Sequence, residues 1–193
     1  MDDIKQAIRK INTQLLDQKQ KIDSLVFLTT NKNATQPTII ANLAIMYAQS
    51  KKKTIIVDTD FSTDRFSGAF NFQDRSGLTD YLEQDISYTE IIKNVPGIDL
   101  SVILPGSVQD DTSALLDDPK FNKLVDTLKT QYELVIVNTP QFKEMSPLRN
   151  IFHVSKNIVL VIDKDQTSKR ALFSMVKSCL KVDGNILGYI SAK

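Results

Sequence analysis

The sequence of 193 residues has few of the side chains that build metal centres, disulfides or redox sites. It contains no tryptophan, one cysteine (Cys179) and one histidine (His153). A single cysteine excludes a disulfide within the chain and a cysteine-based metal site, and one histidine cannot form a histidine cluster. Cys179 falls in a helical apolar pattern, so we expect a buried small hydrophobic side chain. Nothing in the pattern around His153 points to a catalytic role.

Strong net charge and long apolar runs are also absent. The chain carries 24 basic and 23 acidic residues, so its charge gives no reason to expect nucleic acid or lipid as a partner. No stretch approaches the roughly 18–20 apolar residues of a membrane span, and no signal-peptide core follows the polar start. We expect a cytoplasmic protein without direct membrane insertion, which reaches the membrane only through a partner. The basic run at residues 51–53 is expected to be a solvated turn.

Short apolar runs alternate with amphipathic segments along the chain. The runs are continuous, which is typical of strands covered on both faces in a parallel sheet. They span residues 25–28, 54–57, 100–104, 134–137, 158–162 and 186–190, and helical patterns lie at about 38–49, 119–130 and 168–180. This alternation predicts an α/β fold, with a doubly wound, mainly parallel sheet and helices on both faces.

The length favours one domain, which we place at residues 23–193. Residues 1–22 precede the first strand and are predicted to form a separate amphipathic helix. Apolar side chains recur there at helical spacing, at Ile4, Ile8, Ile11 and Leu15. This helix is expected to pack on the domain or on a neighbouring subunit.

The turn between the first strand and the first helix of the domain is where a doubly wound sheet would bind a phosphate. Here the turn spans residues 29–38 and contains no glycine. A working phosphate loop needs glycines that let the backbone curl round the phosphates, a lysine for their charge and a hydroxyl for magnesium. Pro37 removes a backbone donor from the turn, although it suits the first turn of a helix. The turn therefore predicts a helix start without a phosphate to hold.

Several stretches of the chain together resemble one known family. They are ANLA at 41–44, YAQ at 47–49, KKTIIVDTD at 52–60, GLTDYL at 77–82, VIVNTPQ at 135–141 and GNILG at 184–188. In this order they resemble the bacterial tyrosine kinases of capsule and exopolysaccharide synthesis, which belong to the MinD/ParA-like branch of P-loop nucleotidases. Each motif alone is weak, but the resemblance covers nearly the whole chain, and it implies a P-loop nucleotidase fold.

The family's phosphate loop reads roughly Gly-x-Gly-Lys-Ser-Thr, and little of it is retained here. The resemblance sets the two glycines on Asn33 and Thr35 and the lysine on Gln36. It sets the magnesium-binding hydroxyl on Pro37 and the final threonine on Thr38. Only Thr38 matches the family, so the other four are altered cofactor-binding positions.

The second and third motifs are retained in part. The second resembles Val-Asp-x-Asp-x-Arg and keeps Asp58 and Asp60, while Ser62 stands in place of the arginine. The third resembles Val-Ile-Val-Asp-Thr-Pro-Pro and has Asn138 where the family's aspartate would orient magnesium. Two interpretations of the retained acids stay open, a metal-binding remnant and a strand end whose acids face water.

The family's N-terminal helix carries Glu-x-x-Arg-x-x-Arg, which joins subunits into a ring. The matching positions here are Gln6, Arg9 and Asn12, of which only Arg9 is kept. We therefore expect weak ring formation or none.

The altered positions imply a loss of catalysis. Phosphoryl transfer depends on positioning and electrostatics, and losing one such group costs about 10²–10³ in rate. Gln36, Pro37 and Asn138 remove three such groups from one site. The resemblance thus predicts a catalytically impaired relative, a pseudokinase with no cofactor and no metal. It would act through contacts with a membrane-anchored polysaccharide co-polymerase, the adaptor, or with a sister kinase.

Two alternative functions compete with this one. The first is an ATP- and magnesium-dependent protein-tyrosine kinase with an unorthodox phosphate loop, which Asp58, Asp60 and Thr38 would favour. The second is a MinD/ParA-like partitioning protein, against which the long match after the second motif argues. Magnesium-dependent affinity for ATP separates the pseudokinase from the kinase.

Overall fold

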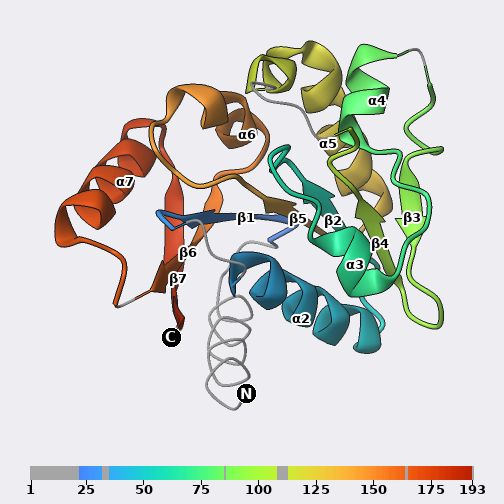
Figure 1. Ribbon diagram of the computed structural model, residues 1–193, viewed down its shortest axis with the longest axis horizontal. Coiled ribbons are helices and arrows are strands. Elements are labelled where there is room, and N and C mark those ends of the chain that lie inside the picture. The colour runs from blue at the N-terminus through green and yellow to red at the C-terminus, as the bar shows by residue number, and fades with distance from the viewer. Residues whose placement is uncertain (1–21, 32–34, 85, 108–112, 164, 193) are drawn as a thin grey trace.

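The computed structural model describes residues 22–31, 35–84, 86–107, 113–163 and 165–192, and these residues build one seven-stranded sheet (Figure 1). The strands are β1 (Ser24–Thr29), β2 (Thr54–Asp58), β3 (Ile92–Asn94), β4 (Leu100–Ile103), β5 (Leu134–Asn138), β6 (Asn157–Asp163) and β7 (Asn185–Ala192). Their order is β3-β4-β2-β5-β1-β6-β7, and only β3 and β4 pair antiparallel. The predicted mainly parallel sheet is confirmed.

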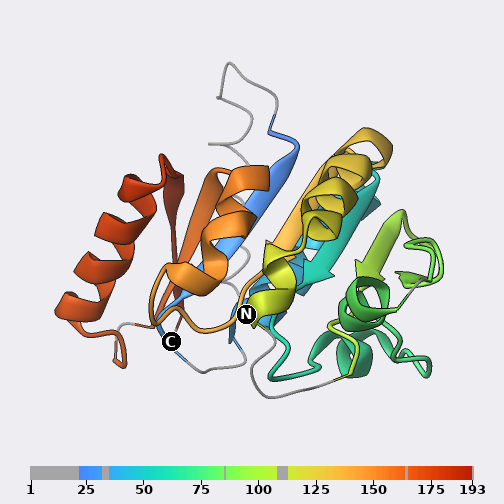
Figure 2. The same cartoon turned by 90° about the horizontal axis from the view of Figure 1, so that it is seen from above.

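Helices cover both faces of this sheet, as Figures 1 and 2 show. They are α2 (Thr35–Gln49), α3 (Phe66–Phe70), α4 (Leu78–Glu83), α5 (Pro119–Gln131), α6 (Arg149–Val154) and α7 (Lys169–Lys181), with 3-10 turns η1 (Ser113–Asp117) and η2 (Ser146–Leu148). Alternate side chains of each strand point to opposite faces and feed two separate cores. In β1, for example, Leu25 and Phe27 pack under α2, whereas Val26 and Leu28 pack under α5 and α6. The predicted double winding is therefore confirmed as well.

The six predicted strands and the three helices predicted within residues 23–193 are all present, with ends that differ by a few residues. The prediction missed β3, α3, α4 and α6, because elements of three to six residues are too short to show a period. Cys179 is fully buried, as expected, and its burial raises the pKa of the thiol to about 11. The predicted N-terminal helix lies outside the described residues apart from Ile22.

The Gly-Leu motif at the start of α4 has a physical reason. A Cβ atom on Gly77 would lie 2.2 Å from the carbonyl oxygen of Leu104 and 2.4 Å from the nitrogen of Gly106, so only glycine fits. Leu78 and Leu82 then fill the core under α5. The motif is thus explained by close backbone packing beside β4.

Candidate functional site

The candidate site lies where the carboxyl ends of three neighbouring strands meet the start of α2. Strand β5 pairs with β1 on one side and with β2 on the other, and this register sets Asn138 beside Asp58. The first turn of α2 follows β1 and brings Gln36 to the same place. In open α/β sheets this edge is where ligands bind.

Gln36, Asn138 and Asp58 are joined by hydrogen bonds, and we call them the buried polar network. The Nε2 group of Gln36 donates to Oδ1 of Asn138 and to the carbonyl oxygen of Thr139, both at 2.9 Å. Nδ2 of Asn138 donates in turn to Oδ1 of Asp58 at 2.7 Å. The same carboxylate oxygen accepts from the backbone N–H of Asp60 at 3.0 Å. One network thus links the starting turn of α2 with the ends of two strands.

The network is closed to solvent. The exposed fractions of Gln36, Asn138 and Asp58 are 2%, 2% and 1%. An amide NH₂ group has two hydrogens, and Gln36 donates both of them to protein oxygens. A ligand that needed this group would first have to break two buried hydrogen bonds, each of which costs about 1–3 kcal/mol to leave unmade.

Asp58 is the titratable member of the network. Burial raises the pKa of its carboxyl well above the ordinary value, although hydrogen bonds from Asn138 and the Asp60 backbone oppose the shift. The nearby acids Asp60 and Asp64 raise this pKa further. No salt bridge found in the described part of the chain involves Asp58, and its Oδ2 atom has no hydrogen-bond partner. Among the described residues, therefore, no cation compensates this buried acid.

The two retained acids have different surroundings. Asp60 follows β2 and is half-buried, and its carboxylate accepts from the Ser62 hydroxyl at 2.6 Å and the Thr63 hydroxyl at 3.1 Å. It therefore organises the turn after the strand, and Ser62 is one of its partners. Of the two interpretations left open for the retained acids, the strand end whose acids face water is wrong for Asp58, because the start of α2 and the end of β5 enclose it.

The hydrogen bonds described above for the network involve none of Thr35, Pro37 and Thr38. Thr35, Pro37 and Thr38 lie in the first turn of α2, where Thr35 and Pro37 are half-buried and Thr38 is exposed. Pro37 thus occupies a helix start, as the sequence predicts. Asn33 lies outside the described residues, as do Gln6, Arg9 and Asn12.

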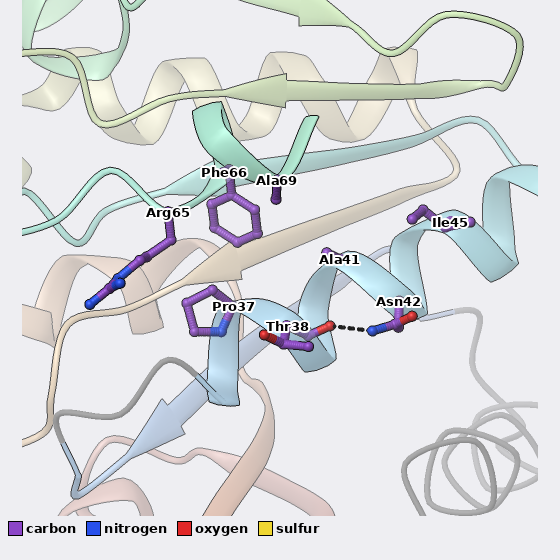
Figure 3. A pocket seen from close by; sticks show the side chains of 8 residues that line it. All are labelled: Pro37, Thr38, Ala41, Asn42, Ile45, Arg65, Phe66 and Ala69. Carbon is purple, nitrogen blue, oxygen red and sulfur yellow. Dashed lines mark hydrogen bonds between the residues drawn. The ribbon is translucent and has the colours of Figure 1, made fainter. Parts of the chain in front are cut away.

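A pocket of about 300 Å³ lies between α2 and α3 (Figure 3). Its lining is formed by Pro37, Thr38, Ala41, Asn42, Ile45, Arg65, Phe66 and Ala69. None of the three network residues lines it. This pocket could not be predicted from the sequence, because its second wall is α3, a helix too short to be recognised by its period.

The described residues contain neither a close cluster of metal-ligating side chains nor a helix that could span a bilayer. Within them, no three His, Cys, Asp or Glu side chains gather closely enough to hold a metal ion. None of the helices in the described ranges has the length and apolarity needed to cross a bilayer. The ring prediction made from Gln6, Arg9 and Asn12 concerns residues outside the described ranges. Analytical ultracentrifugation of the purified chain tests it, and a stable octamer would contradict it.

Known proteins similar to this chain share nearly its full length. No family model matches. The tyrosine-protein kinase CpsD of Streptococcus agalactiae is 29% identical over 192 residues, which cover 96% of this chain and 81% of CpsD. CpsD of Streptococcus pneumoniae is 27% identical over 186 residues, or 94% and 80% of the two chains. CapB of Staphylococcus aureus is 27% identical over 193 residues, or 98% and 84%.

Solved structures are also similar to this chain over most of its length. The chimerical protein CapA2B2 superposes with a TM-score of 0.87 at 26% identity, over 95% of this chain and 82% of the chimera. The kinase domain of VpsO reaches 0.85 at 21% identity, over 100% and 96%. MinD of Pyrococcus horikoshii reaches 0.70 at 18% identity, over 87% and 69%. The last two show the fold alone, and they confirm the predicted P-loop nucleotidase-like architecture.

Proposed function

We propose that this homologue of the bacterial tyrosine-protein kinases CapB and CpsD is a non-catalytic relative that serves capsule or exopolysaccharide synthesis through protein contacts. The observation that carries the proposal is the buried polar network. Its three residues are the ones that the resemblance aligns with the family's phosphate-binding lysine and two of its acids. In this chain they bind one another.

The donor set of the network does not fit a magnesium nucleotide. A phosphate loop presents a free ammonium group and backbone N–H groups to the phosphates, and a hydroxyl to magnesium. Gln36 is uncharged and both of its amide hydrogens are taken, while Pro37 has neither a hydroxyl nor an N–H. We therefore assign no phosphoryl-transfer step to these residues.

The two amides also complement each other. If the family has a lysine and an aspartate here, this chain replaces a cation and an anion with two neutral side chains that remain in contact at 2.9 Å. Losing only one charge would leave the other buried and unpaired, at a cost of several kcal/mol. The paired change supports a site that keeps its packing without the lysine and aspartate charges.

The partner that the resemblance implies is a membrane-anchored adaptor, a polysaccharide co-polymerase, or an active sister kinase. One similar solved structure is itself a chimera named for two proteins, CapA2B2. In this proposal the chain needs no ATP and no metal of its own, and it is cytoplasmic and held near the membrane by contacts. The alternative remains a tyrosine kinase with an unorthodox loop, which would use Asp58, Asp60 and Thr38.

Calorimetry with ATP and ADP tests the proposal. We expect no binding up to millimolar nucleotide, with or without magnesium, because the groups that would meet the phosphates are neutral, occupied or missing. The CpsD relative, titrated under the same conditions, serves as the positive control. Micromolar, magnesium-dependent binding would overturn the proposal in favour of the kinase, and phosphotransfer to tyrosine would then be measured.

A further inference from the structure

The exposed large hydrophobic side chains of the described residues belong to the last two elements of the fold. Phe173 and Leu180 of α7 are 70% and 60% exposed, and Tyr189 of β7 is 64% exposed. Figures 1 and 2 place α7 at the outer end of the molecule, beyond the edge of the sheet. Apolar side chains that gather at one end of a protein indicate a contact surface.

Helix α7 is also strongly basic. It carries Lys169, Arg170, Lys177 and Lys181 and no acidic residue. The whole chain has 24 basic and 23 acidic residues, so the rest of the chain holds 20 basic against 23 acidic. Among the described residues, the salt bridges involve none of the four cations of α7. The helix is therefore a positive segment on an otherwise slightly negative protein.

The cations and the exposed hydrophobics share one face of α7. At 3.6 residues per turn, all six side chains fall within an arc of about 120°. The buried residues Met175 and Cys179 lie on roughly the opposite side of the helix. We call the exposed side the α7 basic–apolar face, formed by Lys169, Arg170, Phe173, Lys177, Leu180 and Lys181.

Tyr189 extends this face onto the sheet. It pairs with Leu160 of β6, whose side chain lies in the core under α5, α6 and α7. Paired residues of neighbouring strands point to the same side, so Tyr189 emerges on the α7 side of the edge strand. Helix α7 runs back between β6 and β7, and Phe173 and Tyr189 both belong to the halves of their elements near the carboxyl edge.

We propose that the α7 basic–apolar face docks directly on an anionic lipid surface. Lysine and arginine side chains are attracted to lipid phosphates, while phenylalanine and leucine enter the boundary between headgroups and acyl chains. Tyrosine is favoured at the same depth, because its ring is apolar and its hydroxyl is polar. The near-zero net charge of the whole chain hides the positive charge of α7. Under this proposal, the sequence prediction that the membrane is reached only through a partner is incomplete.

An acidic protein segment is the other class of partner for such a face, and the shape of the surface argues against it. Peptide segments bind in grooves or add to sheet edges, whereas the six side chains of the α7 basic–apolar face lie on the outer side of one helix and only Tyr189 belongs to the edge strand. A lipid surface needs no groove, and the six side chains can reach it together. Lipid docking is independent of nucleotide binding, so it is tested separately from the proposed loss of catalysis.

Vesicle co-sedimentation of the full chain tests this proposal. One set of vesicles contains equal parts of phosphatidylglycerol and phosphatidylcholine, and the other contains phosphatidylcholine alone. We expect the chain to sediment with the anionic vesicles only, and high salt to weaken binding, because screening shortens the range of the attraction. Equal binding to both vesicles, or none to either, would overturn the proposal.

Two double variants locate the contact. Phe173→Ser with Leu180→Ser, and Lys177→Glu with Lys181→Glu, should each lower partitioning at least about tenfold. All four side chains are exposed, so circular dichroism should show an unchanged fold. Lys120→Glu with Lys123→Glu makes the same charge change on exposed positions of α5 and should keep most of the binding. An equal loss in the α5 variant would sink the assignment, and so would binding of poly-glutamate through α7 without any vesicle binding.

Discussion

Replacing Asn138 by aspartate is expected to lower the free energy of unfolding by about 3–5 kcal/mol at neutral pH. Nδ2 of Asn138 donates to Oδ1 of Asp58 at 2.7 Å, and the substitution puts a second carboxylate oxygen in the donor's place. Two buried carboxylates at this separation cannot both be ionised, so they must share a proton or repel each other. Urea unfolding at pH 7 measures the loss. It should shrink toward acid pH, where the shared proton becomes available.

A surface substitution of the same kind provides the control. Asn94 is exposed at the end of β3, and its Oδ1 accepts from the Ser101 hydroxyl at 2.9 Å, a bond that a carboxylate also accepts. Asn94→Asp should therefore change stability by less than about 0.5 kcal/mol. If Asn138→Asp were equally mild, the two buried amides could not be the closed pair that the proposed function depends on.

Adding Gln36→Lys to Asn138→Asp should restore much of the lost stability. Gln36→Lys brings an ammonium group to the two acids, so the double variant has the same net charge at the three network positions as the native chain. A double-mutant cycle should give a favourable coupling energy of about 1–3 kcal/mol between positions 36 and 138. Simple additivity of the two single changes would contradict the inference that these residues changed together.

The nucleotide affinity of the double variant shows whether the lost charges or the backbone of the turn prevent binding. We expect calorimetry to show no magnesium–ATP binding even with both charges present, because the turn at residues 29–38 still has no glycine and keeps Pro37. Micromolar binding by the double variant would mean that Gln36 and Asn138 alone had closed the site.

The strands were predictable because a parallel sheet buries both faces, and the six runs are continuous enough to recognise. The network was not predictable in the same way. Gln36 and Asn138 lie 102 positions apart, and their hydrogen bond depends on the strand order, which places β5 beside β1. The residues at the site could be named from motifs, but not the fact that they bind one another.

The interpretation of Asp58 as a water-facing acid at a strand end is wrong, and the charge of the segment at residues 169–181 was overlooked, for opposite reasons. The exposure expected for Asp58 depended on what covers the end of β2, and only the packed structure shows that α2 and β5 do so. The basic stretch at residues 169–181, by contrast, is visible in the sequence, but a balance summed over the whole chain averages it away. Charge is therefore better counted element by element.

Asp58 makes the stability of the protein depend on pH. Its pKa is raised in the folded state, so between the unfolded-state value of about 3.9 and the folded-state value the folded chain binds more protons. Its contribution to stability is complete below the unfolded-state pKa and is lost as pH rises through the folded-state pKa. Asp58→Asn removes this titration while keeping an Oδ1 atom that accepts from Asn138 and Asp60.

We therefore expect the stability difference in favour of the Asp58→Asn variant to grow with pH, by about 1.4 kcal/mol for each unit of the pKa shift. Urea unfolding at a series of pH values from about 4 to 8 measures it. Asp74→Asn is a control of opposite sign, because a hydrogen bond from Lys93 lowers the pKa of Asp74 to about 2, so the native acid gains stability only as pH rises from about 2 to about 4, and this difference should be nearly constant from about pH 5 to 8. That effect should be small, since Asp74 is mostly exposed. A constant difference between native and Asp58→Asn chains across this range would mean that a cation neutralises Asp58 in solution, and the site would then hold a charge that phosphate or metal chemistry could use.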